Sequence, residues 1–370
     1  MNSRKVDKIF LFTATLLVMA GIFVFASASL GIFARDEAKF YGIVVNQLLL
    51  GLTCGVIAFL IFSKTPYLIL KKFALPIFVF SLILTALVFI PGVGLEHGGA
   101  TRWINIFSFS FQPSEFLKLG LVVCLAAIFS RNREGSRSFL SGVLPFAALM
   151  AIVAVVMLKQ PDTGTLIVMS SAAAVIYFAA GAKWKHILFL VLIGALGISA
   201  LVSARPYLKD RIVTFLNPNT DPWGSSYQIK QSLIAIGSGE IFGRGLGQSV
   251  QKFNYLPEPV GDSVFAVIGE EFGFFGGALT VILFLALGLR GLKIASNARD
   301  EFGSYLAVGL TTLIISQSFI NMASLIGIFP LTGVPLVFIS HGGTALLFAL
   351  AEIGIVANIS SYGKRLDTRG

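Results

Sequence analysis

The sequence has little charge and few of the residues that bind metals or form disulfides. Only 12% of its 370 residues are charged, about half the share that is usual in soluble domains. Its two cysteines, Cys54 and Cys124, both lie in apolar runs, which is typical of small hydrophobic residues rather than of a disulfide. Three scattered histidines do not favour a conventional zinc site. These shortages exclude a soluble enzyme, a disordered chain and a nucleic-acid-binding domain.

Apolar residues make up most of the sequence. They make up 56% of the chain, and the mean hydropathy is +0.86. A membrane-spanning helix needs about 20 such residues, so we expect an all-α membrane protein with about ten transmembrane helices. The runs are apolar throughout, whereas strands of an outer-membrane barrel alternate apolar and polar residues. The expected spans are 9–33, 41–63, 68–90, 113–130, 139–158, 164–182, 186–203, 264–289, 304–328 and 343–361.

The basic residues predict how these spans are oriented. Most of the 28 Lys and Arg residues lie at the ends of the chain and in alternate connections, and such residues mark the cytoplasmic side of a membrane protein. Both termini are therefore expected in the cytoplasm, and the net charge of +10 needs no nucleic acid. The residues on this side are Arg4, Lys5, Lys8, Lys64, Lys71, Lys72, Arg131, Arg133, Arg137, Lys183, Lys185, Arg290, Lys293, Arg299, Lys364, Arg365 and Arg369.

Two connections on the opposite, outer side are longer than the rest. The first, 91–112, is rich in glycine and ends in an alternating Phe-Ser run. The second, about 205–262, joins the seventh and eighth expected spans, and its stretch 227–236 is amphipathic and suited to a membrane surface. Loops this long are usually functional or disordered. We see no internal repeat, so residues 1–370 are expected to form a single transmembrane domain.

Asp262 is the leading candidate for a catalytic group. It immediately precedes the eighth expected span, and Pro257, Pro259 and Gly261 restrict the approach to it. A desolvated carboxylate at such a position can act as a general base. Asp is also a favoured N-cap residue, so a purely helix-capping role is the alternative.

Four further acidic residues and one lysine are expected to play supporting roles, and the role of a fifth acidic residue, Glu352, is open. Glu270 and Glu271 favour hydrogen bonds that tie down a neighbouring helix over direct catalysis. Glu115 and Lys118 are three residues apart at the start of a span, which predicts a structural ion pair. Glu258 precedes Asp262 in the same outer segment, and Glu352 lies within the last span without an evident partner.

Cations on the outer side are candidates for binding a diphosphate, for which Arg and Lys are the natural partners. The alternative is contact with lipid headgroups. His341 is expected to be a hydrogen-bonding loop residue rather than a ligand. The candidate cations are Arg102, Lys118, Lys159, Arg205, Lys209 and Arg211.

A series of motifs resembles the SEDS family (shape, elongation, division and sporulation), which contains FtsW and RodA. The motifs follow one another along nearly the whole chain. They are Gly-Ala-Thr-Arg-Trp-Ile (99–104), Gln-Pro-Ser-Glu-Phe-Leu-Lys (112–118), Lys-Gln-Pro-Asp-Thr-Gly-Thr (159–165), Gln-Ser-Leu-Ile-Ala-Ile-Gly-Ser-Gly (231–239), Pro-Glu-Pro-Val-Gly-Asp-Ser-Val-Phe-Ala-Val (257–267), Glu-Glu-Phe-Gly (270–273) and Pro-Leu-Thr-Gly-Val-Pro-Leu (330–336), followed by Ser-His-Gly-Gly (340–343).

Two details of these motifs qualify the resemblance. The segment 257–263 looks more like FtsW than RodA, which more often has a Thr-Asp-Phe form there. His341 replaces the Tyr that is usual in the family, so the detail of that loop is expected to differ.

The resemblance implies a peptidoglycan glycosyltransferase of the cytoplasmic membrane that polymerises lipid II into glycan strands and releases undecaprenyl diphosphate. It places the family's essential aspartate at Asp262, with Glu258 and Ser263 beside it as supporting residues. It also implies a divalent cation, Mg²⁺ or Mn²⁺, with Asp262 as its candidate ligand. The implied partners are a class B penicillin-binding protein and, for an FtsW-like role in division, other divisome proteins.

Three alternatives to this hypothesis stay open. A RodA-like polymerase would perform the same chemistry during elongation. A lipid II flippase would also combine many helices with buried charges, although the paired discontinuous helices of transporters are not evident. A scaffold that only recruits the penicillin-binding protein is the third, and it leaves the polar motifs of the outer side without a purpose.

Overall fold

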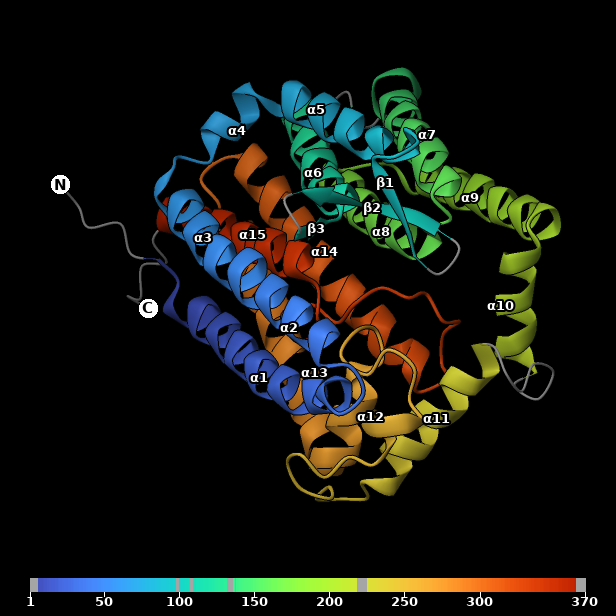
Figure 1. Cartoon of the computed structure of the whole chain (residues 1–370). Helices are drawn as coiled ribbons and strands as arrows, with labels where there is room; N and C mark the ends of the chain where they lie inside the picture. Colours follow the sequence, from blue (N-terminus) through green and yellow to red (C-terminus); the bar gives the residue numbers. More distant parts are fainter. Residues whose placement is uncertain are drawn as a thin grey trace.

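The computed structural model describes residues 6–97, 100–106, 109–131, 136, 138–217 and 225–363. The described chain is mostly helical, as expected (Figure 1). Gly99 and seven of the basic residues named above, Arg4, Lys5, Arg133, Arg137, Lys364, Arg365 and Arg369, lie outside the described residues. The α-helices are α1 (Lys8–Phe33), α2 (Glu37–Val45), α3 (Cys54–Lys64), α4 (Leu68–Lys72), α5 (Ala74–Ala86), α6 (Pro113–Arg131), α7 (Leu144–Lys159), α8 (Thr163–Ala179), α9 (Trp184–Ala204), α10 (Pro206–Leu216), α11 (Ser225–Ser238), α12 (Gln251–Asn254), α13 (Val264–Ser296), α14 (Glu301–Leu325) and α15 (Gly343–Ser361).

Eight helical segments in the described residues are long and apolar enough to cross a membrane. Two of them include a π-helical part, η1 (Asn46–Thr53) between α2 and α3, and η4 (Phe139–Val143) before α7. Two shorter apolar helices, Ala74–Phe89 and Thr163–Ala179, coincide with the third and sixth expected spans. The chain is thus a multi-pass membrane protein.

The expected span 68–90 is not one helix. It is divided at Phe73 into α4 and α5, and its last turn is the 3₁₀ helix η2 (Leu87–Phe89). Pro76 explains the division, because proline has no N–H to donate to the carbonyl four residues earlier, which is that of Lys72. In the first turn of α5 the same proline is tolerated, since the N–H groups there have no helical partner.

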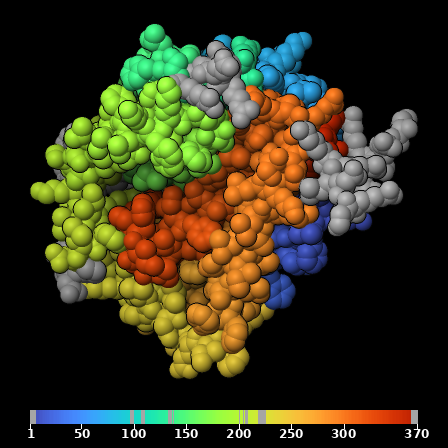
Figure 2. Space-filling model, turned by 180° about the vertical axis from the view of Figure 1, so that it is seen from behind, coloured from blue at the N-terminus to red at the C-terminus, as the bar shows by residue number. Residues whose placement is uncertain are grey.

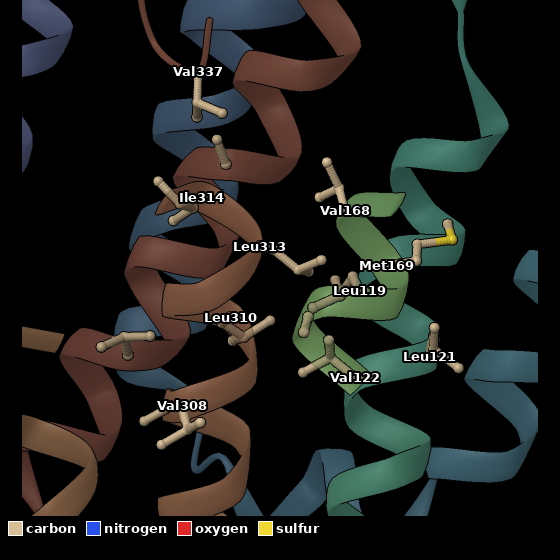
Figure 3. Packing of buried hydrophobic residues seen from close by; sticks show 14 of the residues in the cluster. Leu119, Leu121, Val122, Val168, Met169, Val308, Leu310, Leu313, Ile314 and Val337 are labelled. Carbon is tan, nitrogen blue, oxygen red and sulfur yellow. The ribbon is translucent and has the colours of Figure 1, made fainter. Parts of the chain in front are cut away.

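The centre of the bundle is built from α6, α8, α14 and α15. Figure 3 shows Leu310 and Leu313 of α14 pointing toward Leu119 and Val122 of α6 and Val168 of α8. By contrast, none of the α9 side chains that the structure describes is buried. An exposed apolar helix is stable in a membrane, because lipid tails are as apolar as leucine. The apolar surface of α9 is therefore suited to contact with lipid.

The outer connection 91–112 contains strands, which the all-α expectation did not include. β1 (Gly94–His97), β2 (Ala100–Ile106) and β3 (Phe109–Phe111) form an antiparallel sheet in the order β1-β2-β3. The alternating Phe-Ser run was the signal for it, since a period of two is typical of a half-buried strand.

α13 is broken at Gly273, whose φ of 63° is left-handed. A break frees backbone groups that need partners inside a membrane. Here a loop of the chain supplies them, because the N–H of Phe274 donates to the carbonyl of Glu240 (2.9 Å) and that of Arg244 donates to the carbonyl of Glu270 (2.9 Å). The first half of α13, which begins beside Asp262, is therefore anchored at its far end.

The long outer connection is not an extended loop, because it contains α10, α11 and α12. Its stretch 227–236, expected to be amphipathic, lies in α11, which packs against α13. The segment 326–342, between α14 and α15, lies beside this connection, since Arg211 of α10 donates to the carbonyl of Leu331. Figure 2 shows this face from behind, where the red-orange end of α14 and the segment after it lie between the yellow-green α9–α10 region and the orange α13.

The start of α1 and the end of α15 lie together. The N–H of Asp7 donates to Oγ of Ser360 (3.0 Å), and the Asp7 carboxylate pairs with Arg290 at 2.8 Å. These contacts place the beginning of the first helix and the end of the last on one side of the bundle.

Candidate active site

Asp262 lies where the outer connection enters α13. Its side chain is half-buried, and its Oδ1 accepts a hydrogen bond from Nε2 of Gln228 on α11 (3.1 Å). The same amide donates to Oγ of Ser263 (2.9 Å). Ser263 is the N-cap residue of α13 and makes no side-chain capping bond. The capping alternative for Asp262 is therefore wrong, because its carboxylate faces α11 instead.

The backbone at Asp262 is held from another side. Its carbonyl accepts from Nδ2 of Asn321 on α14 (2.7 Å), and the same amide donates to the carbonyl of Val334 (2.9 Å). One side chain thus joins Asp262 to the segment between α14 and α15. A carboxylate fixed in this way loses little orientational freedom when a substrate binds, which favours catalysis.

Two charged residues act on Asp262. Arg211 of α10 reaches across to donate from Nη1 to the carbonyl of Leu331 (2.8 Å). Glu258 precedes Asp262 by four residues and has a left-handed φ of 45°. Burial raises the pKa of Asp262 to about 6; the hydrogen bond from Gln228 lowers it, the Glu258 carboxylate raises it and the Arg211 guanidinium lowers it. A base with a pKa close to neutral pH is suited to accept a proton and release it again.

Glu270 and Glu271 serve as anchors, as the sequence indicated. Both are buried. Glu270 accepts from Oγ of Ser249 (2.5 Å) and from the N–H of Val250 (3.0 Å). Glu271 pairs with the buried Lys252 at 2.6 Å and accepts from Oγ of Ser27 on α1 (2.7 Å). These bonds fasten the loop after α11 to α13 and α1.

The predicted pair between Glu115 and Lys118 is confirmed. Nζ of Lys118 lies 2.6 Å from Oε2 of Glu115 and donates to Oε1 of Gln317 on α14 (2.6 Å). All three side chains are buried. The charges of Lys118 and Glu115 also act on Glu352 of α15, so this pair is the electrostatic partner that the sequence did not identify for Glu352.

The other candidate cations lie apart from these contacts. Arg102 of β2 binds the turn before α8, donating from Nε to the carbonyl of Gln160 (3.2 Å), and its Nη1 lies 3.9 Å from Asp162. Lys159 lines a separate cavity of about 400 Å³ beneath β1 and β2. Arg205 and Lys209 are exposed at the start of α10. Of the six candidate cations, Arg211 is the one whose charge acts on Asp262.

His341 lies behind the segment that carries Asp262. Its backbone N–H donates to the carbonyl of Val260 (2.6 Å), and its ring stacks on Phe25 with 6.2 Å between centroids. Burial lowers the pKa of His341 to about 4, so the imidazole is neutral at physiological pH. The expected hydrogen bond of this loop residue is made by the backbone.

A divalent cation would find few protein ligands here. The described residues contain no group of three or more His, Cys, Asp or Glu side chains able to hold a metal. Mg²⁺ often binds one or two carboxylates together with substrate phosphates. Asp262 and Glu258 fit that limited role, with a diphosphate providing further oxygen ligands.

Two residues of the site escaped the sequence analysis. Gln228 is 34 residues from Asp262 in the sequence, and Asn321 is 59 residues from it. Asn321 is a buried amide within an apolar span, and polar side chains at such positions are usually bonded for a reason. Its position in the span was therefore an available signal.

Comparisons with known proteins identify the family of this chain. Residues 7–365 match the model of a family described as cell cycle protein, FtsW/RodA/SpoVE. Stage V sporulation protein E of Bacillus subtilis is 40% identical over 353 residues, covering 95% of this chain and 96% of that protein. A probable peptidoglycan glycosyltransferase FtsW of a Geobacter species is 37% identical over 355 residues, covering 96% of each chain.

Two solved structures share the fold. A chain from a peptidoglycan synthase complex that coordinates polymerization and crosslinking superposes with a TM-score of 0.78, at 26% identity and with 96% of this chain and 97% of that chain covered. The rod shape determining protein RodA of Thermus thermophilus has a TM-score of 0.69 at 28% identity, with 96% of each chain covered.

Proposed function

Because the chain belongs to the FtsW/RodA/SpoVE family, we propose that it is a peptidoglycan glycosyltransferase that polymerises lipid II into glycan strands. The observation that carries the proposal is the setting of Asp262. Its half-buried carboxylate accepts from Gln228, its backbone carbonyl accepts from Asn321, and the Arg211 cation influences its charge. A positioned base with a cation nearby is what transfer of a sugar from a diphosphate requires.

Each group has a defined part in the reaction. Asp262 takes the proton from the acceptor sugar hydroxyl while the hydroxyl oxygen forms a bond to the anomeric carbon of the growing chain. The bond from that carbon to the diphosphate breaks, and its electron pair passes to the leaving oxygen of undecaprenyl diphosphate. Arg211 stabilises that negative charge. One base is sufficient, so the paired carboxylates of glycoside hydrolases are not needed.

The site is proposed to face the outer side of the cytoplasmic membrane. The distribution of Lys and Arg supports this orientation, since the connections on the other side carry most of these residues. Both termini would then be cytoplasmic, which agrees with the contact between Asp7 and Ser360. The outer position suits a lipid-linked sugar presented at the outer leaflet.

A divalent cation, Mg²⁺ or Mn²⁺, is part of the proposal. When bound, it would supply charge neutralisation for the leaving diphosphate. Asp262 and Glu258 would hold it on the protein side. Chelation should therefore lower the polymerisation rate, and addition of either metal should restore it.

A class B penicillin-binding protein is the proposed partner. The fold shared with a chain of a peptidoglycan synthase complex supports this pairing. The role in division, with other divisome proteins, follows from the FtsW relatives. A RodA-like role in elongation uses the same chemistry and is the alternative, supported by the likeness to RodA.

The flippase and scaffold alternatives have less support. Broken helices in corresponding positions of two halves are typical of transporters. The break in α13 is instead closed by the chain's own loop through Glu240 and Arg244. A scaffold would not need a carboxylate that is held by the Gln228 amide beside the Arg211 cation.

The test uses purified protein, lipid II and Mg²⁺, with and without the penicillin-binding protein, and resolves glycan products on a gel. The wild type should produce ladders. Asp262→Ala should slow polymerisation by roughly 10²–10⁴-fold, the usual contribution of a general base, without lowering the thermal unfolding temperature.

The matched control is Asp36→Ala, which removes a helix-capping carboxylate at the start of α2. It should polymerise as the wild type does. Equal rates for Asp262→Ala and the wild type would remove Asp262 from the role of base. A wild type that forms no ladder under any condition would favour the flippase or the scaffold.

A further inference from the structure

Gly333 lies in the segment between α14 and α15, in a conformation that few other residues adopt. Its φ is 71°, in the left-handed region where a side chain is strained. Its neighbours are held on three sides. The carbonyl of Leu331 accepts from Arg211 on α10, that of Thr332 lies against Gly164 of α8, and that of Val334 accepts from Asn321 on α14. The position of Gly333 is therefore fixed.

The absent side chain of Gly333 would project between Asp262 and Arg211. A Cβ atom built there lies 3.8 Å from Oδ2 of Asp262 and 4.0 Å from Nη2 of Arg211. Among the described residues, and apart from Gly333 and its two neighbours in the chain, no other heavy atom comes within 4 Å of it. Both distances are ordinary contact distances, so packing does not forbid a methyl group. What a methyl group would do is occupy the space that the carboxylate and the guanidinium share.

This space has the chemistry of the reaction. A carboxylate on one side suits a neutral hydroxyl that must lose a proton, and a guanidinium on the other suits a phosphate oxygen. Both groups approach a single point from different elements, α10 and the entrance to α13.

We propose that Gly333 lines the space between Asp262 and Arg211 and keeps it open because it has no side chain. A sugar hydroxyl can then reach Asp262 while a diphosphate oxygen reaches Arg211. The inference rests on the proposed function. It adds Gly333 as a residue that admits the diphosphate-linked sugar because it leaves the space beside Asp262 and Arg211 empty. A side chain at position 333 would separate the diphosphate of a polyisoprenyl-linked sugar from Arg211.

The chain provides a control for backbone strain. Gly327, in the same connection, has a φ of 75° and nothing within 4 Å of its built Cβ. Substitution there imposes the same left-handed strain without touching Asp262 or Arg211. Comparing the two glycines therefore separates the need for a left-handed residue from the need for an empty space.

The experiment compares Gly333→Ala and Gly333→Asn with Gly327→Ala and Gly327→Asn. Asn tolerates the left-handed region better than Ala, so the Asn variants keep the test valid if the Ala variants fold poorly. Binding of undecaprenyl diphosphate in detergent micelles and the rate of lipid II polymerisation are both measured.

We expect both Gly327 variants to behave as the wild type. Gly333→Ala should weaken binding roughly tenfold, as for one impaired charged contact. It should slow polymerisation roughly 100-fold, as for reactants displaced by about 1 Å. Gly333→Asn should lose more than Gly333→Ala, because its side chain is larger, although its backbone is less strained.

Equal losses at positions 333 and 327, or no loss at position 333, would overturn the inference. A wild type that binds the lipid diphosphate but makes no glycan would overturn the proposed function alone, and the binding comparison would still decide the role of Gly333. A wild type that polymerises lipid II without measurable product binding leaves the decision to the rates. A wild type that does neither overturns both.

Discussion

Asp262 and the neighbouring pair Glu270 and Glu271 lie nine residues or fewer apart, yet their settings are opposite. Both glutamates are fully buried and saturated with partners, namely Lys252, Ser27, Ser249 and the backbone of the loop that follows α11. Asp262 is half-buried and is held by one amide, from Gln228.

The contrast shows how one stretch of sequence supports both structure and chemistry. A carboxylate whose oxygens are all engaged cannot easily accept a proton from a substrate, whereas one with spare capacity can. The glutamates hold the half-helix that begins beside Asp262, and Asp262 stays available. Removing the partners of Glu270 and Glu271 should therefore lower stability, whereas removing the partners of Asp262 should lower the reaction rate.

The largest effect on stability is expected from Lys252→Met. It leaves the Glu271 carboxylate buried without its cation, which should lower the free energy of unfolding by about 3–5 kcal/mol. Denaturant unfolding in detergent micelles measures the change. The double variant Lys252→Met/Glu271→Leu should regain most of the loss, because it buries no unpaired charge.

Arg244→Gln is the matched control for this prediction. Its guanidinium is exposed and lies 3.6 Å from Glu270, and exposed pairs contribute at most about 1 kcal/mol. A loss for Lys252→Met no greater than that for Arg244→Gln would show that the buried pair is not the main anchor.

A smaller effect, on rate, is expected from Gln228→Leu. Leucine fills similar space but donates no hydrogen bond to Asp262, and a bond to a charged group is worth about 1.5–3 kcal/mol. Polymerisation should slow about tenfold or more. Because the Gln228 bond lowers the pKa of Asp262, the acid limb of the pH–rate profile should also move to higher pH.

Gln231→Leu on the same helix is the control for Gln228→Leu. It removes an amide that makes none of these contacts, so rate and pH profile should match the wild type. A slower Gln228→Leu enzyme with an unchanged pH profile would mean that Gln228 acts by packing and not through the charge of Asp262.

The smallest effect is expected from Glu258→Gln. With the pKa of Asp262 at about 6, the base is ionised above that pH, and activity should fall as the pH drops through 6. The Glu258 carboxylate raises this pKa. Its removal should therefore shift the acid limb to lower pH. At pH 8 and saturating Mg²⁺ the rate should change little, because excess metal offsets the loss of one ligand. A shift to higher pH would contradict the assigned influence of Glu258.

Local sequence was sufficient for some features of the site. Glu115 and Lys118 are three residues apart in one helix, so their pairing followed from helix geometry alone. The ten expected apolar segments were readable in part. Eight helical segments of the described chain are long and apolar enough to cross a membrane, because length and hydrophobicity define such a helix. Pro76 lies in the third expected segment, and a proline within an apolar run predicts a break in the helix.

Other features depend on residues that are distant in the sequence. Whether Arg211 or Lys209 would act on Asp262 could not be read from two cations two residues apart on one helix; the packing of α10 against the segment after α14 decides it. Gln228 and Asn321 became part of the site in the same way. The sheet β1-β2-β3 had a visible period of two in part of its sequence, but that period does not specify which strands pair or in which register.

The sequence by itself determined that this protein crosses the membrane many times and belongs to a family of cell-wall polymerases, because hydrophobic runs and ordered motifs are properties of the chain. It also marked Asp262 as the residue to examine. Only the tertiary structure decided that Asp262 faces α11 instead of capping its helix, that Glu270 and Glu271 are saturated by a returning loop, and that Gly333 leaves a space between a carboxylate and a guanidinium. These outcomes depend on which distant backbone and side-chain groups meet, because a buried polar group takes its role from the partners that packing brings to it.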